Sequence, residues 1–164
     1  MHSASIRSAA AAALRAVLPG ATILSWLLLA PWSGASAEDT ALAEKPFAEH
    51  RLVLQLSDAD QRKQRLVISV ANNLLKLYGP DRIAIEVVTF GPGIELVTAH
   101  SPNRPYVDSL VAQGVRFDVC MNTVETIERE KGERPQLNPN AMPVQAGVAQ
   151  ILALTEKGYT LVRP

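Results

Sequence analysis

Cys120 is the residue of this sequence whose position most favours nucleophilic chemistry. It ends a run of β-forming residues, 115–120, and residues with helical spacing follow it. Backbone N–H groups in the first turn of a helix carry partial positive charge, which stabilises a thiolate and lowers the pKa of the thiol. A buried cysteine that packs as a small apolar side chain is equally consistent with this position. The chain holds one Cys, which excludes an internal disulfide and a cysteine-rich zinc site.

Two helix starts are predicted beside strand ends. Asp58 and Asp60 follow the first predicted strand and precede residues with helical spacing, so both are predicted to be helix caps. Asn122, with Glu125 three residues later, has the spacing of a capping box and predicts a helix that opens at Asn122.

Arg116 and Asp118 alternate with apolar residues in the strand that ends at Cys120. A strand buried on both faces usually lacks this alternation, so the pattern predicts one polar face. The two charged side chains would then be solvated, paired with neighbouring groups or placed at a subunit contact.

Other chemistries have less support in the sequence. His100 lies well beyond the second predicted strand and is expected in a surface loop, whereas His50 precedes the first strand and should lie at the opposite edge of the sheet. Neither histidine has the paired spacing of a metal site, and no metal or other cofactor is predicted. Gly91–Gly93 begins like a dinucleotide fingerprint, but Leu96 replaces the third glycine, so a tight turn is predicted.

Strand and helix patterns alternate through the rest of the chain. The predicted strands are Leu52–Leu56, Ile83–Phe90, Val115–Cys120, Met142–Gln145 and Tyr159–Val162. The predicted helices are Asp60–Tyr78, Ile94–Ala99, Tyr106–Gln113, Asn122–Lys131 and Val148–Lys157. Short links between parallel strands require helical crossovers, so the alternation predicts a three-layer α/β fold with a mostly parallel sheet of about five strands.

The carboxyl ends of parallel strands meet at one edge of a sheet, where ligands collect in such folds. Four predicted strand ends bring polar or small residues to that edge. The residues expected to line a site with Cys120 are Ser57, Asp58, Gly91, Gly93, Met121, Asn122, Gln145 and Gly147.

The N-terminus has the pattern of a secretory signal peptide. Residues 1–37 contain two arginines and no acidic residue, the apolar run Ala21–Ala30, and an Ala-Ser-Ala ending at Ala37. The apolar run is shorter than the roughly 20 residues that span a bilayer. Cleavage after Ala37 and a periplasmic protein are therefore predicted, and the alternative is an uncleaved N-terminal anchor. A loose arm at 38–49 and one domain at 50–164 would follow.

Cleavage would change the composition of the protein. The 164-residue chain has 16 basic and 16 acidic residues, and the signal segment takes two of the basic residues and both tryptophans. The processed protein would then have a net charge of −2 and no tryptophan. A mildly acidic domain without tryptophan is a poor candidate for binding nucleic acid or a membrane.

Three segments in this order resemble the DsrE/DsrF-like family. They are Gly114–Cys120, a Gly-Val strand that ends in Cys, then Pro143–Val148 with its Pro-Val and Gly-Val pairs, and Ile151–Tyr159 with its closing Gly-Tyr. The resemblance covers about residues 50–164. It implies a small flavodoxin-like fold and assembly as a homotrimer or homohexamer.

The resemblance also implies sulfur chemistry. Members of this family take part in sulfur oxidation and sulfur relay, in which a cysteine after a central strand carries a persulfide, and that role would fall on Cys120. Its partner would be a protein thiol or a small sulfur species. The predicted export excludes tRNA thiolation, and Met121, Asn122 and Thr123 stand where relay members often carry small residues. The alternative is a non-enzymatic, oligomeric small-ligand-binding module in which Cys120 is buried.

Overall fold

The computed structural model describes Lys45 and residues 47–164. The predicted signal peptide, residues 1–37, and most of the predicted arm, 38–49, lie outside the described residues. Within the described part, no helix has the length and apolar character needed to cross a bilayer.

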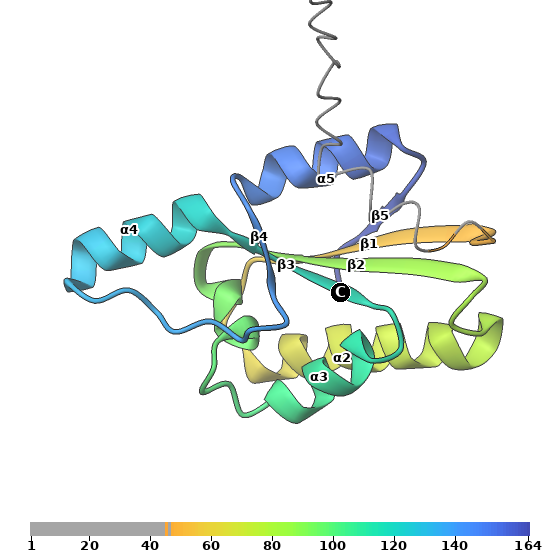
Figure 1. Ribbon diagram of the computed structural model, residues 1–164, viewed down its shortest axis with the longest axis horizontal. Helices are drawn as coiled ribbons and strands as arrows, with labels where there is room; N and C mark the ends of the chain where they lie inside the picture. The colour runs from red at the N-terminus through yellow and green to blue at the C-terminus, as the bar shows by residue number, and fades with distance from the viewer. Residues whose placement is uncertain (1–44, 46) are drawn as a thin grey trace, which may run out of the picture. The chain divides into compact units, whose positions relative to one another are not determined.

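A sheet of five parallel strands forms the centre of the domain, in the order β4-β3-β2-β1-β5 (Figure 1). The strands are β1 His50–Leu56, β2 Ile83–Thr89, β3 Arg116–Cys120, β4 Met142–Val144 and β5 Thr160–Val162. Because all pairs are parallel, the strands end at the same edge of the sheet. The prediction of a three-layer, flavodoxin-like α/β fold is confirmed.

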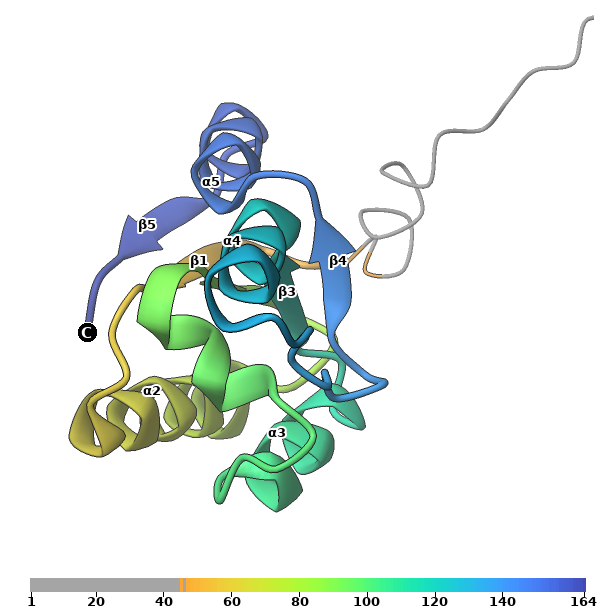
Figure 2. The same cartoon turned by 90° about the vertical axis from the view of Figure 1, so that its left-hand side faces the viewer.

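Helices cover both faces of this sheet. Helices α2 (Gln61–Tyr78) and α3 (Arg104–Val111) lie on one face, and α5 (Gly147–Glu156) lies on the other (Figure 1). The 3₁₀ helix η1 (Gly91–Val97) follows β2, and α4 (Met121–Lys131) follows β3. Figure 2 shows α4 in front of the end of β3, with η1 beside it and α5 above it.

The larger core lies between the sheet and α2 and α3. Helix α2 buries one stripe of side chains at helical spacing: Gln64, Val67, Ile68, Ala71 and Leu75. Asp60 caps this helix by accepting a hydrogen bond from the Arg62 N–H at 2.7 Å, as predicted. Asp58 is not a second helix cap. It accepts from the Asp60 N–H at 3.0 Å and pairs with Lys63, so it holds the turn before the helix.

The smaller core lies under α5. It shows that the prediction of one solvated, polar face for β3 is wrong. Arg116 and Asp118 do alternate with apolar residues, but Asp118 is fully buried and β3 is covered on both faces. The face expected to be solvated is buried because the Arg116 Nε–H donates to the Asp118 Oδ1 at 2.6 Å. Of the outcomes left open by the sequence, pairing between neighbouring groups is the one observed.

The described end of the arm contacts the domain. The Lys45 ammonium donates to the Ile83 carbonyl at 3.1 Å, and Ala48 packs in the smaller core. Next to the start of β1, the Glu49 carboxylate accepts from the Nε and the Nη2 of Arg82, at 3.0 and 2.7 Å.

Candidate functional site

Helix α4 begins at Met121, directly after Cys120, and the cysteine occupies its N-cap position. The capping box predicted at Asn122 and Glu125 is therefore wrong, because the N-cap is Cys120, two residues before Asn122. An N-cap side chain typically accepts hydrogen bonds from the backbone N–H groups two and three residues later. Here those N–H groups belong to Asn122 and Thr123. The Cys120 side chain makes no capping hydrogen bond in the structure, so the sulfur lies near these N–H groups without capping the helix.

Several groups near the Cys120 sulfur affect the pKa of its thiol. Burial by itself raises the pKa of this thiol, but the Thr123 hydroxyl and the N–H groups of Gly147, Thr123 and Asn122 outweigh burial and hold the pKa below its ordinary value. Gly147 is the first residue of α5, so the N-termini of two helices converge on one sulfur. Both helix dipoles favour negative charge there.

Thr123 links the thiol to the turn after β2. Its Oγ1 accepts a hydrogen bond from the Gly91 N–H at 3.0 Å, which leaves the hydroxyl proton free to point toward Cys120. The Gly91 N–H therefore orients the donor that lowers the pKa of the thiol. The sequence alone did not indicate Thr123, since the predicted N-cap was Asn122 rather than Cys120.

Gly147 packs tightly between Phe90 and Cys120, so a side chain at this position would crowd both residues. A Cβ at this position would lie 3.1 Å from the Phe90 Cβ and 3.4 Å from the Cys120 Cβ. The ring of Phe90 belongs to the smaller core and closes the site on that side.

Asn122 and Gln145 form a polar strap beside the thiol. The Gln145 Nε2–H donates to the Asn122 Oδ1 at 2.8 Å, and the Asn122 N–H donates to the Gln145 carbonyl at 3.2 Å. In the neutral form, the Cys120 thiol faces the same carbonyl at 4.0 Å. The strap fixes the loop before α5 against the start of α4, which positions both helix N-termini.

The remaining predicted site residues have contacts elsewhere in the domain. Gly93 packs against the backbone of Leu56 and Ser57 at the end of β1. The tight turn predicted at Gly91–Gly93 is the start of η1, which also replaces the helix predicted at Ile94–Ala99. Asp58 is held by Lys63, and Met121 packs against the larger core. None of these side chains supplies a donor to Cys120.

A groove opens next to Thr123, between η1 and α4. Its volume is about 580 Å³. Its lining consists of Gly91, Pro92, Glu95, Asn122, Thr123, Thr126, Ile127, Glu130 and Lys131. Cys120 is 5% exposed and does not line the groove, but its neighbours Asn122 and Thr123 do. A small molecule in the groove would contact the two residues that donate to the sulfur.

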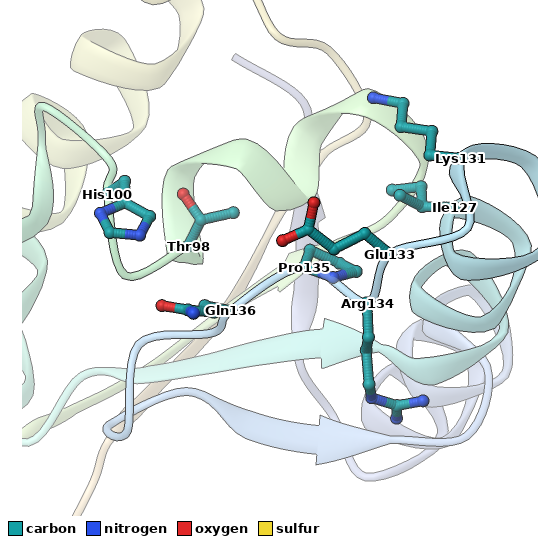
Figure 3. Close-up of a pocket in the computed structure, with 8 residues that line it drawn as sticks. All are labelled: Thr98, His100, Ile127, Lys131, Glu133, Arg134, Pro135 and Gln136. Carbon is teal, nitrogen blue, oxygen red and sulfur yellow. The ribbon is translucent and has the colours of Figure 1, made fainter.

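A second cavity of about 330 Å³ shares Ile127 and Lys131 with the groove. Figure 3 shows Thr98, His100 and Gln136 along one side of it and Lys131 at the other end. His100 is exposed there, as expected for a loop histidine. His50 lies at the start of β1, at the opposite edge of the sheet, where its ring packs against Tyr78 with centroids 4.1 Å apart and the ring planes tilted by 42°.

No histidine contributes to the donors around Cys120 in the part of the chain that the structure describes. The same part contains no group of three or more His, Cys, Asp or Glu side chains arranged to hold a metal ion. The chemistry that this site supports is therefore that of a thiolate held by neutral hydrogen-bond donors.

No protein-family model matches the chain, and no curated protein matches it. The structure is similar to that of MTH1491, a protein of unknown function from Methanobacterium thermoautotrophicum, with a TM-score of 0.63 and 29% sequence identity. The match covers 71% of this chain and 100% of that chain. Because the function of MTH1491 is unknown, this likeness bears on the fold.

Proposed function

We propose that this is a sulfur-handling protein in which Cys120 accepts, holds and passes on sulfane sulfur. The observation that carries the proposal is the convergence of two helix N-termini and the Thr123 hydroxyl on one sulfur atom, with a lowered thiol pKa. The resemblance of segments 114–120, 143–148 and 151–159 to the DsrE/DsrF-like family supports the same role.

The reaction would be a thiol exchange in two steps. The Cys120 thiolate attacks a sulfane sulfur of a polysulfide, a new S–S bond forms at Sγ, and the donor leaves as a polysulfide anion shortened by one sulfur. A thiolate of a partner protein or a small thiol then attacks the outer sulfur and releases Cys120 as a thiolate. The donors around Sγ stabilise the anion at the beginning and at the end of this cycle.

The test is the intact mass of the protein after incubation with inorganic polysulfide. The wild type is expected to gain the mass of one or more sulfur atoms, removable by a reducing agent. Cys120→Ala should gain none, because the chain has no other Cys. Absence of the adduct from folded wild-type protein would contradict the proposal.

The alternative is a binding module in which Cys120 has only a packing role. The 5% exposure of Cys120 and the adjacent groove of about 580 Å³ favour this alternative. Alkylation of the folded protein by iodoacetamide separates the two readings. A binding module would react only when it is unfolded, whereas a sulfur carrier would react while folded.

We also propose that the protein works as a homo-oligomer. Helix α5 is apolar on its inner face and also on its outer face. On the outer face, Val148 and Leu152 are 57% and 59% exposed. The sheet ends on both sides in strands of three residues, β4 and β5, whose edges need protection. A trimer or hexamer is the size that the family resemblance suggests.

Leu152→Asp is expected to shift the oligomer to monomers, since it places a charge in the apolar contact. Leu77→Asp is the matched control, because Leu77 is 70% exposed on α2, on the opposite face of the sheet. Light scattering at micromolar concentration measures both variants. A monomeric wild type, or equal dissociation of both variants, would contradict an interface at α5.

Export is the third proposal, and it rests on the pattern of residues 1–37. Loss of this segment removes Trp26 and Trp32, so the exported protein is expected to show tyrosine emission only. Tryptophan emission from the exported material would mean that the segment is retained.

A further inference from the structure

Two acidic side chains are buried together under α5. Glu86 on β2 is 4% exposed and Asp118 on β3 is fully buried. The Arg116 Nε lies 2.6 Å from the Asp118 Oδ1 and 3.7 Å from the Glu86 Oε2. The mechanism proposed above makes no use of this cluster.

One guanidinium is a poor match for two buried carboxylates. The Asp118 Oδ2 has no hydrogen-bond partner among the described residues. A buried carboxylate oxygen without a donor is strongly unfavourable, whereas a proton on Asp118 that is donated to Glu86 removes the deficit. Burial, and then the negative charge of Glu86, raise the pKa of Asp118 to about 7.

The other groups around the pair come from four elements. The Gln150 amide on α5 donates to the Glu86 Oε2 at 3.4 Å, and Tyr159 before β5, Arg51 on β1 and Lys45 of the arm also face the cluster. Burial, then the charge of Glu86, raise the pKa of Tyr159 to about 12. Burial opposes the charge on Arg116, but Asp118 outweighs it and raises the pKa of that guanidinium. Asp118 is thus the member that titrates near neutral pH.

Asp118 lies on the same face of β3 as Cys120. The two residues are two positions apart in one strand, which places their Cα atoms about 7 Å apart. Glu86 is farther along the sheet, because its partner in the β2–β3 register is Arg116. Helix α5 joins the two sites a second time, since Gln150 contacts Glu86 and Gly147, one turn earlier, lies next to Cys120.

We propose that Asp118 is a positioning residue whose shared proton controls the acidity of the Cys120 thiol. The inference rests on Cys120 being the reactive thiol of the proposed function. While Asp118 holds the proton, the pair carries one negative charge, located on the more distant Glu86. When the proton leaves, a second negative charge appears on the face of β3 that carries Cys120, two residues from it. A like charge disfavours the thiolate. Ionisation of Asp118 and of Cys120 therefore oppose each other, and the thiol titrates in two coupled steps.

The test is the rate of iodoacetamide alkylation of Cys120 between pH 5 and 10 in three folded proteins. Asp118→Asn supplies an N–H to Glu86 in place of the shared proton and keeps an oxygen for Arg116. Its profile is expected to be a single step, with alkylation roughly threefold to thirtyfold faster than in the wild type at about pH 8. Glu86→Gln instead removes the charge that adds to burial in raising the pKa of Asp118, so Asp118 is expected to ionise at a lower pH than in the wild type and the first step of the profile to move to lower pH.

Identical profiles for the wild type and Asp118→Asn would overturn the inference. If Asp118→Asn does not fold, as judged by circular dichroism, the comparison of Glu86→Gln with the wild type decides, and two identical two-step profiles would overturn it. Sulfur loading is measured separately by intact mass. A two-step alkylation profile without sulfur loading would contradict the sulfur role of Cys120 and support its coupling to Asp118. Sulfur loading with a single-step profile would support the sulfur role and contradict the coupling.

Discussion

Replacing Gly93 with alanine is expected to lower the free energy of unfolding by about 3 kcal/mol or more. An alanine Cβ would overlap the Leu56 carbonyl oxygen and lie 2.7 Å from its carbon. Neither backbone can easily retreat. The Leu56 oxygen accepts the Phe90 N–H at 3.1 Å, and Leu56 is paired with Thr89 in the sheet.

Gly158→Ala is the matched control for this substitution. Gly158 has a φ of 86°, but nothing lies within 4 Å of an added Cβ, so only the backbone conformation is disfavoured. A loss of about 1 kcal/mol is expected. Urea unfolding of both variants measures the difference, and a Gly93→Ala loss no larger than that of Gly158→Ala would show that the turn can move away from β1.

Thr123→Val is expected to raise the pKa of the Cys120 thiol by about one unit. Valine has the shape of threonine but lacks the hydroxyl, which is the strongest of the hydrogen-bond donors to the thiolate. A hydrogen bond to a charged group contributes about 1.5–3 kcal/mol, and one pKa unit corresponds to about 1.4 kcal/mol. The rate of alkylation at about pH 6, where Asp118 keeps its proton, should therefore fall roughly tenfold.

Thr123→Ser is the control, because it keeps the hydroxyl that accepts from Gly91 and donates to Cys120. Alkylation rates from pH 5 to 10 give the thiol pKa of each variant. Equal pKa values for the valine and serine variants would show that the helix N-termini alone determine the acidity of the thiol.

The substitutions at Gly93 and Thr123 test two effects of the same packing of η1 against the end of β1. Gly93 lets η1 pack against the end of β1, and this contact places Gly91 where its N–H reaches Thr123. The acidity of the thiol therefore depends on the packing of a turn that never touches the sulfur.

The sequence by itself determined the order of strands and helices, the parallel sheet and the position of Cys120 at a strand end. These features follow from local patterns: apolar residues repeat with the period of a strand or a helix, and Gly79, Gly114 and Gly132 end elements where a positive φ is needed. Asp60 was recognised as a helix cap for the same reason, since its hydrogen bond is made within two residues.

Tertiary structure decided what surrounds the cysteine. The strand pattern had already placed Gln145 and Gly147 at the same edge of the sheet as Cys120. The contact of Thr123 with Gly91, and the position of Cys120 as the N-cap of α4, follow only from the fold. The burial of Asp118 was also not predictable from its strand. A charged residue in an alternating pattern is expected to face water. Asp118 is buried because Glu86 and α5, from distant segments, cover it, and Arg116 in the same strand pairs with it.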